Sequence, residues 1–126
     1  MKVLVCETSK DRAKLISDLL NDYRYKIHVN YSGDKVLTDV QELKPSLIIV
    51  NANMKPDSGV SILEKIKLDP RYSKIPVILI SNFTSTELPA KVKNFPNVDY
   101  LVEPFKIKNF RHIVERWINF RSLYVN

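Results

Sequence analysis

Five short apolar runs recur along the chain, and the segments between them carry apolar residues at helical spacing. The runs occupy residues 2–6, 26–29, 46–50, 77–80 and 99–102. Runs of this length, rich in Val, Ile and Leu and bounded by turn-forming residues, predict β-strands. The third run, SLIIV, is apolar from Leu47 to Val50, which is typical of a strand covered by helices on both faces.

Five amphipathic segments follow the five runs and predict helices. The first follows Ser9 and the second follows Ser32, both suitable N-cap residues. The third covers residues 62–66, and the fourth, over 84–94, is interrupted by a proline. The last segment carries its apolar residues on one side, at Ile107, Phe110, Ile113, Val114, Trp117 and Ile118. Arg121 would fall within that apolar stripe, so we expect the last helix to fray by about residue 120.

Strictly alternating strands and helices imply parallel strands joined by right-handed crossovers, with helices on both faces. We therefore predict a doubly wound five-stranded parallel α/β domain. In such a sheet the functional site lies beyond the carboxyl ends of the strands, near the point where the strand order reverses. The residues at those ends are Glu7 and Thr8 after the first strand, Asn51 after the third, Ser81 after the fourth and Glu103 after the fifth.

The length and composition of the chain fit one globular domain. Its 126 residues are 44% hydrophobic and 27% charged, and no apolar run approaches the ~20 residues that a membrane helix needs. A single cysteine, Cys6, cannot form an internal disulfide, and the first residues lack the pattern of a signal peptide. We expect one domain over residues 1–126, in the cytoplasm, either alone or as part of a longer protein.

The net charge of +6 is concentrated near the carboxyl end. Residues 104–126 hold five basic residues against the single acidic Glu115, a local charge of +4. The basic residues there are Lys106, Lys108, Arg111, Arg116 and Arg121. A surface of this kind binds nucleic acid or an acidic protein partner, or is simply a solvated helix face. The aromatic residues among them, Phe110 and Trp117, fall on the predicted buried side, which disfavours nucleic acid.

Four stretches of the chain stand out by their order and spacing. They are KVLVCETSKDRAKLISDLL, PSLIIVNANM with the SG that follows, LDPRYSKIPVILIS and DYLVEPF. The interval from Asn51 to Ser81 is 30 residues, and that from Ser81 to Glu103 is 22 residues. Together these features resemble the receiver domain of two-component response regulators, the CheY-like group of the flavodoxin-like fold. The resemblance spans essentially the whole chain and implies the strand order 2-1-3-4-5.

The resemblance also implies a chemistry, in which a histidine kinase transfers a phosphoryl group to an aspartate after the third strand. Two acidic residues after the first strand help to hold Mg²⁺ in that family, and this chain has Glu7 and Thr8 in their places. Asn51 stands at the position of the phosphoacceptor aspartate. An uncharged amide with a delocalised nitrogen lone pair is a poor nucleophile, and one carboxylate is a poor cage for Mg²⁺.

Three further positions complete the comparison with the family. Ser81 keeps the residue type that hydrogen-bonds the phosphoryl group, and Tyr100 stands where the family has its switch aromatic. Glu103 replaces the lysine that pairs with the phosphoryl group, and two like charges at ~4 Å repel by a few kcal/mol at a near-surface dielectric. We therefore predict that aspartyl phosphorylation is lost and that the chain is not an enzyme, with no cofactor and no bound metal.

The carboxylate of Glu103 admits two arrangements. With Glu7 and Asn51 it could form a weak divalent-cation site built from oxygen ligands. We favour instead a pairing of Glu103 with a nearby lysine, either Lys55 or Lys106.

Other chemistry-bearing residues lack a supporting pattern. Asp57 could be a shifted phosphoacceptor, but it lies in the loop six residues after Asn51, away from the strand ends. Cys6 sits in an apolar strand, which predicts a core position. His28 and His112 are far apart in sequence and show neither triad nor zinc spacing.

We interpret the chain as a degenerate receiver, a pseudo-receiver that acts without phosphorylation as a protein-interaction module in two-component signalling. The resemblance implies an output and dimerisation face made by the fourth helix, the fifth strand and the fifth helix. We expect Lys106, Lys108, Arg111 and Arg116 to face solvent there, free to meet an acidic surface of a signalling protein or a second copy. The alternatives are a phosphoacceptor that uses a non-standard residue and a basic nucleic-acid-binding module; no membrane association is expected.

Overall fold

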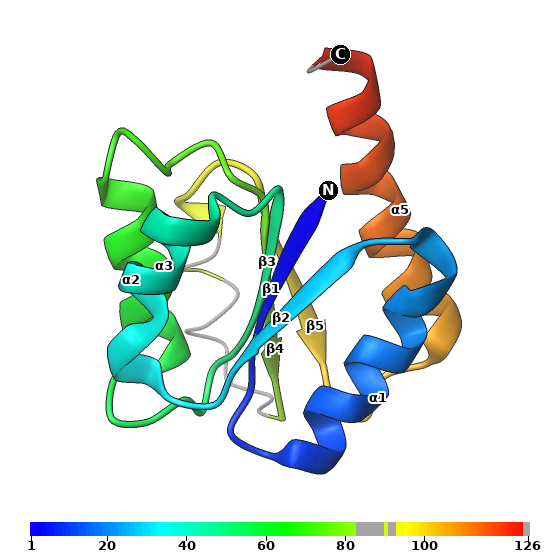
Figure 1. Cartoon of the computed structure of the whole chain (residues 1–126), viewed down its shortest axis with the longest axis horizontal. Helices are drawn as coiled ribbons and strands as arrows, with labels where there is room; N and C mark the ends of the chain where they lie inside the picture. The colour runs from blue at the N-terminus through cyan, green and yellow to red at the C-terminus, as the bar shows by residue number, and fades with distance from the viewer. Residues whose placement is uncertain (83–89, 91–92, 125–126) are drawn as a thin grey trace.

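The chain folds around a five-stranded parallel sheet (Figure 1). The strands are β1 (Lys2–Cys6), β2 (Lys26–Asn30), β3 (Leu47–Asn51), β4 (Val77–Ser81) and β5 (Val98–Val102). Their order, β2-β1-β3-β4-β5, confirms the predicted doubly wound fold, and the bounds of each strand lie within one residue of the predicted ones. This computed structural model describes residues 1–82, 90 and 93–124, with side chains up to residue 118.

Helices cover both faces of the sheet. They are α1 (Lys10–Leu20), α2 (Val36–Leu43), α3 (Gly59–Leu68) and α5 (Ile107–Tyr124), with the short 3₁₀ turns η1 (Asn21–Tyr23) and η2 (Gly33–Lys35). Figure 1 shows α2 and α3 on one face of the sheet and α1 and α5 on the other. The helix expected over residues 84–94 lies largely outside the described residues. Among the described helices, none is long and apolar enough to cross a membrane.

The sheet separates two apolar layers, because successive side chains of a strand point to opposite faces. In β1, Leu4 and Cys6 pack in the layer that contains α2 and α3, whereas Val3 and Val5 pack in the layer that contains α1 and α5. Every residue of β3 and β4 is buried, which explains why these strands are apolar runs rather than alternating patterns. The two layers hold the strand ends in fixed register.

The last helix is longer than the sequence pattern predicts. α5 continues to Tyr124, so the predicted fraying before that point is wrong. Among the side chains described in α5, up to residue 118, Phe110 and Val114 are the buried ones, and both lie in the first half of the helix. Figure 1 shows the second half projecting beyond the sheet. Once a helix has formed, each further residue adds a backbone hydrogen bond, so a continuous apolar stripe is not required for it to continue.

Gly59 lets the start of α3 lie directly against the end of β3. Its amide donates to the carbonyl of Ala52 at 2.9 Å. A Cβ atom at this position would lie 2.2 Å from the carbonyl oxygen of Asn51, and it would also meet the backbone of Ala52. Backbone atoms cannot rotate away as a flexible side chain can. The close approach therefore requires glycine, and it fixes the strand end that carries Asn51.

Replacing Gly59 by Ala is expected to destabilise the fold by roughly 2–4 kcal/mol, because the added methyl group must displace backbone at a buried strand end. Urea unfolding followed by circular dichroism measures the change. Glu64→Ala, in the same helix but away from this contact, is the control, with an expected effect below about 1 kcal/mol. Equal stability of Gly59→Ala and the unsubstituted protein would contradict the close approach.

Candidate functional site

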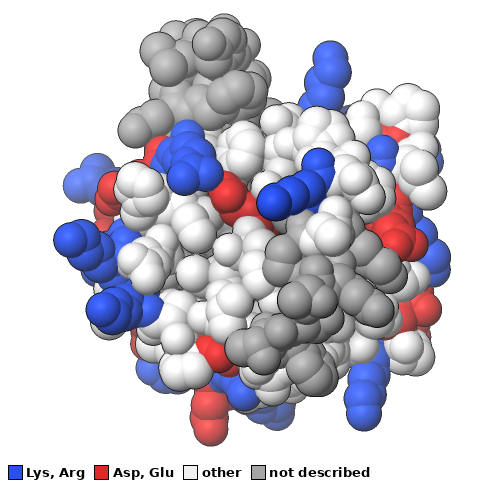
Figure 2. All heavy atoms as spheres, turned by 180° about the vertical axis from the view of Figure 1, so that it is seen from behind, with Lys and Arg blue, Asp and Glu red and all other residues white. Residues whose placement is uncertain are grey.

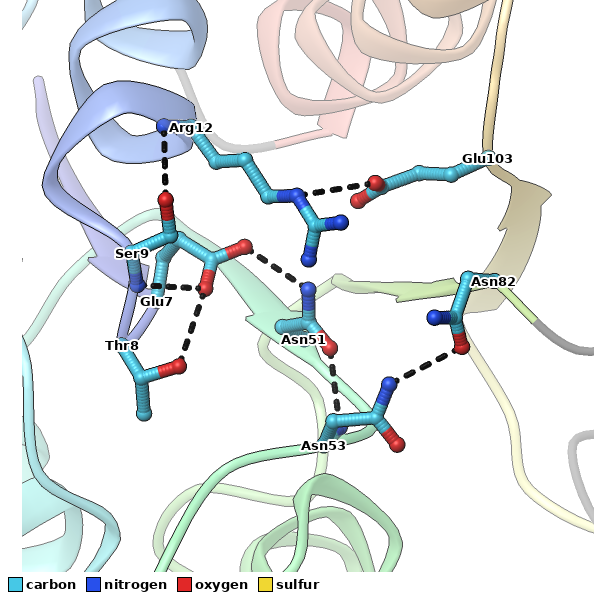
Figure 3. Close-up of polar contacts among 8 residues, drawn as sticks. All are labelled: Glu7, Thr8, Ser9, Arg12, Asn51, Asn53, Asn82 and Glu103. Carbon is cyan, nitrogen blue, oxygen red and sulfur yellow. Dashed lines mark hydrogen bonds and ion pairs between the residues drawn. The ribbon is translucent and has the colours of Figure 1, made fainter.

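The carboxyl ends of four strands bring the predicted residues together. Glu7 follows β1, Asn51 ends β3, Ser81 ends β4 and Glu103 follows β5. The amide of Glu103 donates to the carbonyl of Ser81 at 2.7 Å, which continues the pairing of β4 and β5 by one residue. We refer to these four residues as the strand-end site, and Figure 3 shows the polar contacts around it. The structure thus places these residues at the carboxyl edge of the sheet, where strand alternation predicts them.

Glu7 is the buried charge of the site, with an exposed fraction of 1%. Its carboxylate accepts hydrogen bonds from the amide of Ser9 at 3.0 Å and from Nδ2 of Asn51 at 2.7 Å. The hydroxyl of Thr8, which is exposed, donates to the same carboxylate over 3.4 Å. A buried carboxylate is stable only when hydrogen-bond donors or a cation satisfy it. Within the described part of the chain, donors fulfil this requirement and no basic side chain pairs with Glu7.

Asn51 is buried, and both ends of its amide are engaged. Nδ2 donates to Oε1 of Glu7, and Oδ1 accepts from the amide of Asn53 at 2.8 Å (Figure 3). A carboxylate can only accept and a backbone N–H can only donate, so the two neighbours fix the orientation of the Asn51 amide. An aspartate in this position could still accept from Asn53, but it would set one carboxylate against another at Glu7.

Glu103 pairs with Arg12, which corrects the expectation of Lys55 or Lys106 as its partner. Nε of Arg12 lies 3.3 Å from Oε2 of Glu103. Arg12 belongs to the first turn of α1, and its side chain reaches across to the end of β5 (Figure 3). Burial is the main cause that raises the pKa of Glu103; Arg12 acts in the opposite direction, and the negative charge of Glu7 adds to the rise.

The remaining predicted residues of the site have defined surroundings. Ser81 is fully buried. Tyr100 is half-buried and packs against the apolar layer between the sheet and the helices α2 and α3. At the rim, Nδ2 of Asn53 donates to Oδ1 of Asn82 at 3.0 Å, a contact between β3 and β4 loops that sequence reasoning missed. The only feature of the sequence that pointed to this contact was the pair of asparagines two residues apart, Asn51 and Asn53.

The side chains of the strand-end site do not fit as ligands of the Mg²⁺ ion that the resemblance implies. Mg²⁺ requires several oxygen ligands in octahedral geometry, usually including more than one carboxylate. Here both oxygens of the Glu7 carboxylate already accept from N–H or O–H donors, and Asn51 directs its NH₂ group, not its oxygen, toward Glu7. Among the residues that the structure describes, no group of three His, Cys, Asp or Glu side chains could hold a metal ion.

Two arginines of α5 are engaged within the chain, which corrects the expectation that they are free. Nη2 of Arg111 lies 2.9 Å from Oδ2 of Asp22, and Nη1 of Arg116 lies 3.1 Å from Oδ1 of Asp99. The indole N–H of Trp117 also donates to Asp99, at 2.6 Å. The acidic partners come from η1 and β5, distant in sequence, so no local pattern revealed these pairs. Lys106 and Lys108 are exposed and form no ion pair with any described residue. Of the four basic residues that the sequence predicted for the partner face (Lys106, Lys108, Arg111 and Arg116), the expectation of an unpaired side chain thus holds for the two lysines.

The other candidates from the sequence lie outside the strand-end site. Asp57 forms an ion pair with Lys65 at 2.9 Å on the surface of α3. Cys6 is 1% exposed and lies in the core as predicted, where burial raises the pKa of its thiol. Nε2 of His28 lies 3.9 Å from Oδ2 of Asp39, at the edge strand β2.

Comparison with known proteins agrees with this geometry. Residues 3–115 match the family described as the response regulator receiver domain. The transcriptional regulatory protein ZraR of Salmonella typhimurium is 25% identical over 115 residues, which are 90% of this chain and 25% of that protein. The sensor histidine kinase TmoS of Ectopseudomonas mendocina is 27% identical over 120 residues, 95% of this chain and 12% of that one. The chain thus spans a quarter or less of the length of these relatives.

Solved structures share the fold. The chemotaxis response regulator CheY4 of Vibrio cholerae aligns with a TM-score of 0.81 at 23% identity, covering 92% of this chain and 97% of that one. The signal receiver domain of a signal transduction histidine kinase from Syntrophus aciditrophicus aligns with a TM-score of 0.86 at 20% identity, covering 99% and 93% of the two chains. At these identities the likeness concerns the fold alone.

Asn51→Asp is expected to destabilise the fold at neutral pH by roughly 2–4 kcal/mol, because it removes a donor from buried Glu7 and adds a second carboxylate. The crowded pair then takes up a proton more readily in the folded state than in the unfolded state. The penalty is therefore present above the raised folded pKa and disappears as the pH falls through it. Urea unfolding at neutral and at acidic pH measures both effects.

The matched control is Asn53→Asp, which adds the same charge two residues away at an exposed side chain. Its stability should follow the unsubstituted protein at both pH values, within about 1 kcal/mol. An Asn51→Asp variant as stable at neutral pH as this control would contradict the bond between Asn51 and the Glu7 carboxylate.

Proposed function

Since this chain belongs to the response regulator receiver domain family, we propose that it is a pseudo-receiver, a receiver domain that works without phosphorylation. It acts as a protein-interaction module in two-component signalling. The observation that carries the proposal is the amide of Asn51 at the end of β3, bonded to the buried carboxylate of Glu7 at 2.7 Å.

Transfer of a phosphoryl group to a side chain needs a nucleophile. The nitrogen lone pair of the Asn51 amide is delocalised, and the group carries no charge. One end of the amide donates to Glu7 and the other accepts from Asn53. Neither end is available to attack phosphorus without breaking a buried hydrogen bond, which supports the loss of the reaction.

The charges around Asn51 also oppose phosphoryl transfer. A transferring phosphoryl group is stabilised by cations placed in advance. Glu7 and Glu103 both carry carboxylates here, and the nearby Arg12 already pairs with Glu103 at 3.3 Å. Two formal negative charges against one positive charge leave a net charge of −1, which repels an anionic phosphodonor.

The rival functions have less support. A shifted acceptor at Asp57 would have to break the ion pair with Lys65 at 2.9 Å, and it lies away from the strand ends. Binding of nucleic acid through α5 would rely on its basic residues. Arg111 and Arg116 are already paired with Asp22 and Asp99, which lowers the positive charge that the helix offers.

The parts associated with switching in the family remain, although the trigger is changed. Ser81 is buried at the end of β4, and Tyr100 packs against an apolar layer from β5. Without a phosphoryl group, only a bound partner or ligand with different affinities for two arrangements of these residues can shift their equilibrium. The module is therefore held in one state or set by its partner.

The partner face that we propose includes β5 and the start of α5. Val102 and Ile107 are exposed apolar side chains there, at 40% and 52%, with exposed Lys106 and Lys108 beside them in sequence. Figure 2 views the molecule from behind and shows an uncharged area bordered by both basic and acidic side chains. Apolar residues supply affinity in such an interface, and rim charges raise the association rate.

Purified protein incubated with acetyl phosphate and Mg²⁺ should remain unmodified, as judged by its intact mass, because Asn51 cannot form an acyl phosphate. The triple variant Thr8→Asp, Asn51→Asp, Glu103→Lys should gain one phosphoryl group that hydroxylamine removes, whereas Asn51→Asp alone should gain little. Asp57→Asn in the original chain tests the shifted acceptor. A stoichiometric phosphoadduct on the unsubstituted protein would overturn the proposal.

The double charge reversal Lys106→Glu, Lys108→Glu should slow and reduce capture of the proteins that the unsubstituted chain enriches from a native lysate, while leaving the fold intact. Both side chains are exposed and form no ion pair among the described residues, so their reversal breaks no such pair. Lys35→Glu, an equally exposed reversal on the far side of the sheet, is the control. Loss of capture by Asn51→Ala, with capture retained by the double reversal, would locate function at the strand-end site instead.

A further inference from the structure

A cavity of about 630 Å³ lies at the amino-terminal edge of the sheet, opposite the strand-end site. It is formed where the end of α2 meets the turn between α3 and β4. The lining residues are Gln41, Lys44, Pro45, Arg71, Tyr72 and Ile75. Sites for small molecules have volumes of about 300–1,000 Å³ and combine apolar walls with a few polar groups. The size and composition of this cavity match that description.

Arg71 is held in place as a flat cation on one wall of the cavity. Its Nε and Nη2 donate to the two carboxylate oxygens of Asp69, at 3.1 and 2.8 Å. The guanidinium lies over the ring of Tyr72, 4.9 Å from the ring centroid. Guanidinium planes of this kind stack on planar rings and still donate from their free edge. The Asp69 pair thus orients the Arg71 guanidinium as a flat surface on which a ring can stack. Nη1 takes no part in the bonds to Asp69.

The turn that carries Arg71 and Tyr72 is fixed from below by a buried lysine. Lys67 is 7% exposed, and its Nζ donates to the carbonyls of Ser73 at 3.0 Å and Ile75 at 2.6 Å. Nδ2 of Asn97 donates to the carbonyl of Lys74 at 3.1 Å. A cavity wall that is already ordered loses little conformational entropy when a ligand binds.

Lys44 supplies a second cation on the opposite wall. Its backbone is left-handed, with φ of 49°, and its amide donates to the carbonyl of Val40 at the end of α2. The ammonium forms no ion pair with any residue in the described ranges. Lys44 and Arg71 together with Asp69 give the cavity a net charge of +1, so it favours an anion over a cation.

We propose that this cavity binds a small planar anion, an aromatic ring that carries a phosphate or a carboxylate group. The anionic group binds to the ammonium of Lys44, and the ring lies on the Arg71 guanidinium with Pro45 and Ile75 as the apolar floor. The side-chain amide of Gln41 offers one donor group and one acceptor to the ring edge. This site does not depend on the proposed loss of phosphorylation, because it lies at the other edge of the sheet.

Titrations followed by amide NMR chemical shifts and by thermal unfolding test the proposal. The probes are adenosine monophosphate and guanosine monophosphate for phosphate-bearing rings, and 4-hydroxybenzoate for carboxylate-bearing rings. We expect saturable shifts at residues 41–45 and 71–75 and a rise in melting temperature with at least one probe. Adenosine, which lacks the anion, and inorganic phosphate, which lacks the ring, should both bind at least about tenfold more weakly, since each loses one of two contacts.

Two variants separate charge from shape. Lys44→Asn removes the ammonium and keeps a residue type that tolerates the left-handed backbone, and Arg71→Lys keeps the charge but removes the plane. Each should weaken binding by about tenfold, whereas the control Lys74→Gln should not change it. Absence of saturable shifts with all probes would overturn the proposal. So would binding of inorganic phosphate as tight as that of the ring-bearing probes, or an affinity of both variants equal to that of the unsubstituted protein.

Discussion

The carboxylate of Glu7 sets the constraint on which the strand-end site depends. It is 1% exposed, so it must receive donors or a cation from within the fold. Asn51 and Ser9 supply N–H donors at 2.7 and 3.0 Å. An amide at residue 51 is therefore more than the loss of a nucleophile, because it stabilises a buried charge that a second carboxylate would destabilise.

Ion pairing within the chain also offsets part of the charge that the sequence suggested was free for function. Glu103 is matched by Arg12, and the basic face of α5 is partly matched by Asp22 and Asp99. These exposed or half-exposed pairs contribute little to stability individually, about 0–1 kcal/mol. Their effect on recognition is larger, because a paired arginine offers less charge to a partner than its place in a helical pattern indicates. The charge count of a segment is thus an upper bound on its electrostatic attraction.

Sequence patterns predict what local periodicity controls and miss what long side chains do across the fold. The strand bounds and the gathering of Glu7, Asn51, Ser81 and Glu103 followed from alternation and from the strand-end rule. The strand order 2-1-3-4-5 followed instead from the resemblance to receiver domains. The partner of Glu103 did not, because Arg12 reaches it from the first turn of α1, 91 positions earlier in the chain. The length of α5 was missed for another reason: apolar periodicity reports burial, whereas helix continuation depends on local backbone bonding.

The two candidate sites lie at opposite ends of the same strands. Lys44 and Pro45 directly precede β3, which ends at Asn51, and Ile75 precedes β4, which ends at Ser81. Every residue of both strands is buried, and close-packed strands transmit displacement along their length rather than absorbing it. A ligand that fixes the amino ends of β3 and β4 would therefore bias the positions of Asn51 and Ser81 without entering the strand-end site. Under the proposed loss of phosphorylation, the domain would in this way retain an input, provided that the ligand binds one arrangement of the strand ends more tightly than the other.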